Sequence, residues 1–107
     1  MKVEVLYVAE CPSHPVAVRL VKDILLAEGL VEKVQEVLVK DERMAGELKF
    51  PGSPTIRING RDVAGETQKA RNFALSCRLY PGSKQAGLPP EEMIHRAVIE
   101  ALQEDRA

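Results

Sequence analysis

The chain has 107 residues, of which 45% are hydrophobic and 29% charged, and its formal net charge is −1. This size fits one domain, over residues 1–107, whose core needs no disulfide framework. The near-neutral charge and the absence of tryptophan argue against nucleic-acid binding. No apolar run approaches the roughly 18 residues of a membrane span, and no apolar signal segment opens the chain. We therefore expect a cytoplasmic protein with no nucleic-acid or membrane partner.

Hydrophobic spacing predicts strands and helices in the order β-α-β-α-β-β-α. The expected elements are a strand over residues 2–8, a helix over 15–30, a strand over 34–39, a short helix over 41–50, a hairpin over 55–63 and a helix over 91–105. Gly29 is a natural stop for the first helix, and Asp41 could cap the second. Asn59-Gly60 suits the two central positions of a type I′ hairpin turn.

The predicted order indicates an α/β fold. The opening β-α-β unit requires parallel strands joined by a right-handed crossover, and the hairpin adds an antiparallel pair. We expect a four-stranded mixed sheet with helices on both faces. The stretch from residue 64 to residue 90 is a long connection before the last helix, and a connection of that length is usually functional or has structure of its own.

Two short motifs carry a resemblance to a known family. Cys11 follows the first strand, and Ser53-Pro54-Thr55 opens the third, with Pro54 lying 43 positions after Cys11. With the predicted element order, this resembles the thioredoxin superfamily, especially its small glutaredoxin-like members, over nearly the whole chain. The chain is also similar to small bacterial thioredoxin-like proteins with CPxH, GSPT and SCRLY segments. The resemblance implies a thioredoxin-like fold in which Cys11 is the nucleophile, Pro54 is cis beside it, and Ser53, Pro54 and Thr55 bind the substrate.

The motif around the cysteine departs from the family. The usual Cys-x-x-Cys is here Cys11-Pro12-Ser13-His14, so disulfide exchange within the motif is impossible. A thiolate carries out such chemistry, and the N–H groups and dipole at a helix start favour one. The first helix has two possible starts: either Pro15 is its first residue and His14 its N-cap, or Cys11 is the N-cap. The alternative for Cys11 is a buried, unreactive cysteine.

His14 and Cys77 are the other candidate catalytic residues. His14 could stabilise the Cys11 thiolate or accept its proton, or it could join Cys11 in a metal chelate; otherwise it is an exposed helix-start residue. Cys77 lies in the long connection, which leaves the sheet at the edge where Cys11 is expected, so it could supply the missing resolving thiol. Arg71 and Arg78 would favour its thiolate. Otherwise Cys77 packs under the loop.

Three functions follow from these residues. The first is a thiol-based redox protein, in exchange or sensing, in which Cys11 attacks a disulfide and Cys77 or glutathione resolves the product. The second is binding of a soft metal or an organomercurial through Cys11, Cys77 and His14. The third is a non-catalytic thioredoxin-like module that holds an extended peptide. We predict the first, with a thiol- or disulfide-bearing protein or a small thiol as partner and no cofactor except glutathione.

Overall fold

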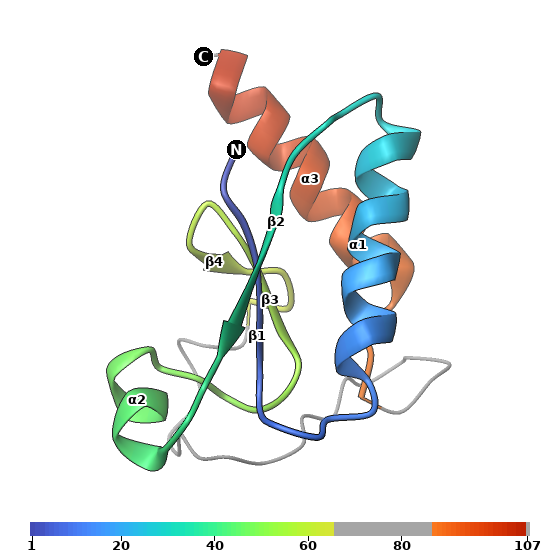
Figure 1. Cartoon of the computed structure of the whole chain (residues 1–107). Helices are drawn as coiled ribbons and strands as arrows, with labels where there is room; N and C mark the ends of the chain where they lie inside the picture. The colour runs from blue at the N-terminus through green and yellow to red at the C-terminus, as the bar shows by residue number, and fades with distance from the viewer. Residues whose placement is uncertain (66–86, 107) are drawn as a thin grey trace.

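The computed structural model describes residues 1–65 and 87–106. Cys77, with Arg71 and Arg78, lies outside the described residues. The elements are β1 (Val3–Tyr7), α1 (His14–Ala27), β2 (Val34–Leu38), α2 (Glu42–Glu47), β3 (Thr55–Ile58), β4 (Arg61–Asp62) and α3 (Glu91–Arg106) (Figure 1). Over these described residues the predicted order is confirmed, and the predicted bounds differ only at their ends.

The four strands form one mixed sheet in the order β2-β1-β3-β4. β1 pairs in parallel with β2 and antiparallel with β3, and β3 pairs antiparallel with β4. In this register, Val5 of β1 lies opposite Glu36 of β2 on one side and Ile56 of β3 on the other. The predicted α/β class and mixed sheet are confirmed.

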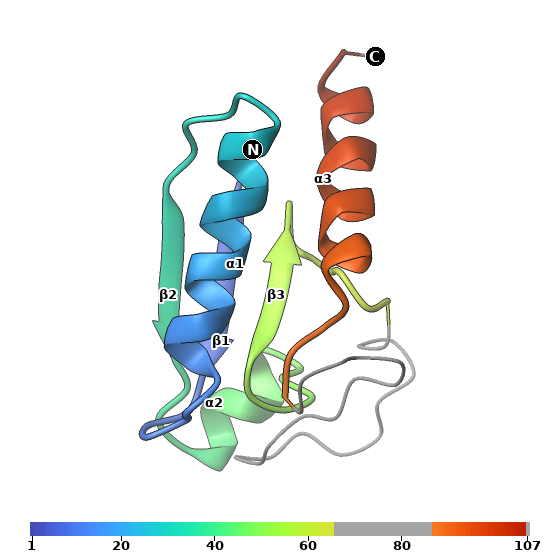
Figure 2. The ribbon, with the colours of Figure 1, turned by 90° about the vertical axis from the view of Figure 1, so that its right-hand side faces the viewer.

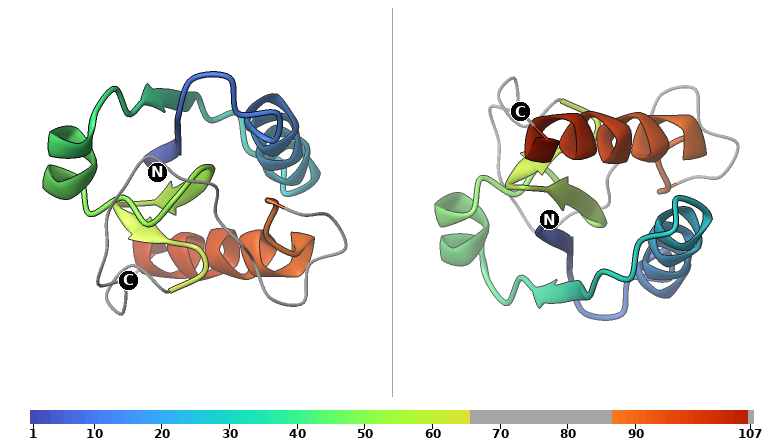
Figure 3. Two further views of the ribbon diagram at one scale, coloured as in Figure 1. Left: turned by 90° about the horizontal axis from the view of Figure 1, so that it is seen from below. Right: turned by 90° about the horizontal axis from the view of Figure 1, so that it is seen from above.

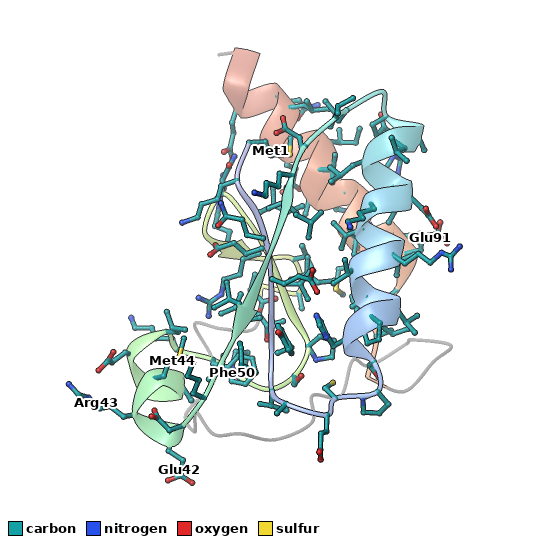
Figure 4. The ribbon with its side chains drawn as sticks, in the orientation of Figure 1. Met1, Glu42, Arg43, Met44, Phe50 and Glu91 are labelled. Carbon is teal, nitrogen blue, oxygen red and sulfur yellow. The ribbon has the colours of Figure 1, made fainter. Side chains whose placement is uncertain are left out.

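The helices cover both faces of the sheet, because successive residues of a strand point to opposite faces. α1 and α3 run side by side over one face, and α2 lies over the other (Figures 2 and 3). Val5 contributes to the core under α1 and α3, while Leu6 contributes to a smaller core under α2. The small core also contains the fully buried Phe50. Figure 4 shows Phe50 between α2 and the sheet, with Glu42 and Arg43 pointing outward.

Three local predictions are confirmed by the backbone. The chain leaves α1 through Gly29, whose φ is 72°, in the left-handed region that glycine adopts at helix ends. The side chain of Asp41 accepts a hydrogen bond of 2.8 Å from the backbone N–H of Met44 and caps α2. Asn59 and Gly60 have φ values of 53° and 81°, as a type I′ turn requires.

Candidate functional site

Cys11 lies where two tight turns meet between β1 and α1. Its N–H donates to the carbonyl of Val8 at 3.3 Å, and its own carbonyl accepts from the N–H of His14 at 3.2 Å. The first turn places Glu10 at a φ of 62°. Cys11 is partly buried, and within the described residues its thiol is free. The backbone of Cys11 is therefore fixed on both sides, while its sulfur is not.

Helix α1 begins at neither of the two predicted starts. Ser13 is the N-cap, His14 the first helical residue and Pro15 the second, so Cys11 stands two residues before the N-cap. Prolines have no N–H, which removes a donor at Pro12 and at Pro15, and the amide of His14 is bonded to the Cys11 carbonyl. The helix start therefore offers Cys11 few free N–H donors.

Ser53, Pro54 and Thr55 lie next to the Cys11 turn. The Ser53–Pro54 peptide bond is cis, as the resemblance implied. The hydroxyl oxygen of Ser53 accepts a hydrogen bond of 3.1 Å from the N–H of Val8, whose carbonyl accepts from Cys11. Val8 thus joins the two predicted motifs through its own backbone. All three residues are buried, so a substrate reaches them only if the atoms that cover them move aside.

His14 is held by two residues that the sequence analysis did not identify. Its Nε2 lies 2.6 Å from Oε1 of Glu36 on β2, and its ring stacks in parallel on Tyr7 of β1, with centroids 3.5 Å apart. Its side chain is only 19% exposed, so His14 is a helix-start residue, as the alternative held, but a partly buried one. A sequence signal for Glu36 exists: it lies two residues after the buried Val34, at a strand position that faces α1.

The segment that returns from the long connection packs against the same turn. A side-chain carbon built on Gly87 would lie 2.6 Å from Oγ of Ser13, and the φ of Gly87 is 79°. The next residue, Leu88, is buried in the core under α1 and α3. The Cys11–His14 turn is therefore held by the sheet, through Glu36, and by the chain that leads into α3.

We expect Gly87→Ala to destabilise the fold by more than Gly29→Ala does. Both glycines have positive φ, which costs roughly 1–2 kcal/mol for an L-residue, but an added carbon at Gly29 meets no atom within 4 Å. The free energy of unfolding of each variant is measured in urea. The difference between the two losses is the cost of the contact with Ser13. Adding Ser13→Ala to Gly87→Ala should recover part of that extra cost. Equal losses for the two single variants would contradict the packing described.

The described residues do not assemble a metal site. Among residues 1–65 and 87–106, no group of three or more His, Cys, Asp or Glu side chains is placed to hold an ion. Nε2 of His14 is already engaged by Glu36. The predicted ligand set of Cys11, Cys77 and His14 includes Cys77, which lies outside the described residues.

None of the described helices has the length and apolar character needed to cross a membrane.

Comparison with known proteins gave no match of the chain to a protein-family model, to a curated protein or to a solved structure. The site combines a thiol on a constrained turn, a buried Ser53 bonded to that turn, and a histidine fixed by a carboxylate.

Proposed function

We propose that the protein is a thiol-based redox protein of thioredoxin-like fold, in which Cys11 is the nucleophile. The mixed four-stranded sheet with helices on both faces is compatible with that fold. The observation that carries the proposal is the bonding of Val8, whose N–H donates to Ser53 and whose carbonyl accepts from Cys11. It supports a single site that contains the thiol and the loop before the cis proline.

The proposed chemistry is thiol–disulfide exchange. The Cys11 thiolate attacks one sulfur of a substrate disulfide, a new S–S bond forms, the old one breaks, and the departing sulfur leaves as a thiolate. A second thiol then attacks the mixed disulfide and releases Cys11. Position 14 is histidine, so this second thiol comes from outside the motif. Two sources are open: Cys77 of the same chain, or a small thiol such as glutathione.

Chain length permits the intramolecular route. Cys77 precedes Gly87 by ten residues, and Gly87 packs against Ser13 in the Cys11 turn. A chain of that length spans up to about 35 Å when extended, and a disulfide requires Cα atoms within about 7 Å. The connection between Gly87 and Cys77 is thus long enough for Cys77 to reach Cys11, and the Cys77→Ser variant distinguishes this route from resolution by external glutathione.

The test is whether the protein catalyses exchange between reduced glutathione and a small mixed disulfide. The rate is measured as the loss of reduced glutathione. We expect the protein to accelerate the exchange, and we expect Cys11 to react with iodoacetamide in the native state. A Cys11 that reacts with iodoacetamide only after unfolding would contradict the proposal.

Two other results would favour the alternative functions. Tight stoichiometric Hg²⁺ binding without exchange, lost in a Cys11→Ser/Cys77→Ser variant, would favour the metal-binding alternative. Peptide binding that survives Cys11→Ala would favour a non-catalytic module.

A further inference from the structure

The contacts of the His14 ring have a chemical consequence beyond anchoring the start of α1. The ring is fixed in position by stacking on Tyr7 and by its 2.6 Å contact with Glu36. A carboxylate only accepts hydrogen bonds, so Nε2 carries the proton in this contact. In the neutral ring the lone pair then belongs to Nδ1. Glu36 therefore selects the tautomer as well as the orientation.

The backbone brings Cys11 to this ring. The 3.2 Å hydrogen bond from the His14 N–H to the Cys11 carbonyl closes a tight turn, whose end Cα atoms lie within about 7 Å. The turn sets the two side chains three positions apart at the start of α1, and a proton passes between them, directly or through one water molecule, when their heavy atoms come within hydrogen-bond reach. Within the described residues the Cys11 thiol forms no disulfide, so it is available to react.

We propose that Glu36 is a positioning residue that holds His14 with Nδ1 as the base for the Cys11 thiol. This inference rests on the proposed function, because it requires Cys11 to act as nucleophile. The S–H bond of Cys11 breaks, and its proton passes to Nδ1. The resulting imidazolium is balanced by the Glu36 carboxylate, and the face of the Tyr7 ring favours the cation further. These two are the described groups that contact the ring from β2 and β1.

The proton then completes the exchange. The Cys11 thiolate bonds to one sulfur of a disulfide substrate, and the S–S bond of that substrate breaks. The leaving sulfur departs as a thiolate and takes the proton from Nδ1, so that it is released as a thiol. His14 returns to its neutral form with Nε2 still donating to Glu36, so atoms and charge balance over the step without a further oxidant or reductant.

The main test is the pH profile of Cys11 alkylation by iodoacetamide in the native Cys77→Ser background. We expect Glu36→Gln, which keeps an oxygen acceptor but removes the charge beside the imidazolium, to slow alkylation near neutral pH about tenfold and to move the rise of the profile to higher pH. His14→Asn should do the same, and the double variant should lose little more. The control is Glu47→Gln, because Glu47 is exposed on α2 and pairs there with Arg43, away from the His14 ring.

A second readout separates positioning from a merely structural role. Nitrogen-15 NMR of the imidazole should show the proton on Nε2 in the parent protein and lose that preference in Glu36→Ala. A proton on Nδ1, or a Glu36→Gln profile identical to that of the parent, would overturn the inference. A Glu36 variant with a lower unfolding free energy but an unchanged pH profile of Cys11 alkylation would also overturn it. Alkylation that depends on Glu36 without exchange on any disulfide would refute the proposed function alone; exchange that is independent of Glu36 would refute only the positioning role.

Discussion

Replacing Cys11 with serine is expected to abolish thiol–disulfide exchange, leaving only the uncatalysed rate. A serine hydroxyl lacks the acidity and nucleophilicity of a thiol, and the described part of the chain holds no other cysteine at this turn. The fold should survive, because Cys11 is only partly buried and its described hydrogen bonds are made by its backbone. The measurement is the exchange rate with glutathione, together with the unfolding midpoint in urea. Substantial exchange in a folded Cys11→Ser protein would contradict the assignment of the nucleophile.

The matched variant, Cys77→Ser, identifies the resolving thiol. If Cys77 resolves the intermediate, this variant completes the first attack and accumulates a mixed disulfide on Cys11 at low glutathione concentration. If glutathione resolves it, exchange by the variant equals that of the parent. Either result keeps Cys11 as the nucleophile, and they differ only in the source of the second thiol.

Replacing Phe50 with alanine is expected to lower the free energy of unfolding by about 3–5 kcal/mol. Phe50 has 0% exposure and packs with Leu6, Val39 and Ala45 in the small core under α2. Deleting its ring removes buried apolar surface and leaves a cavity, a loss that is large beside the total stability of about 5–15 kcal/mol of most domains. Urea unfolding monitored by circular dichroism gives the difference directly.

Val31→Ala is the control for this substitution. Val31 is 95% exposed, and changes at exposed positions usually alter stability by less than about 0.5 kcal/mol. A loss below about 1 kcal/mol for Phe50→Ala would show that α2 does not form a packed second layer. Because Phe50 lies three residues before Ser53, the same variant should also loosen the loop that bonds to Val8.

The sequence predicts the elements well because their signals are local. The alternation of residues 55–58 and the Asn59-Gly60 turn depend on neighbours a few positions apart, and so does the cap at Asp41. The start of α1 was predicted incorrectly because two prolines close to His14 permit several helix starts. The structure begins the helix at His14 itself, with its amide bonded to the Cys11 carbonyl.

The contacts within the candidate site were not predictable in the same way. Glu36 meets His14 only because the parallel register of β1 and β2 places β2 beside the first turn of α1. Ser13 meets Gly87 only because the chain returns from a long connection at that point. Both contacts depend on the three-dimensional path of the chain, which periodicity does not encode. The cis Ser53–Pro54 bond was expected from the family resemblance alone.

Peptide mass mapping without reduction, after the native protein is exposed to glutathione disulfide, tests the central claim most directly. The proposed function predicts that Cys11 reacts first and is recovered either bound to glutathione or linked to Cys77. The Cys77→Ser variant should yield only the glutathione adduct on Cys11. Recovery of Cys11 as a free thiol from the native protein, with modification only after unfolding, would contradict the assignment of Cys11 as the reactive centre.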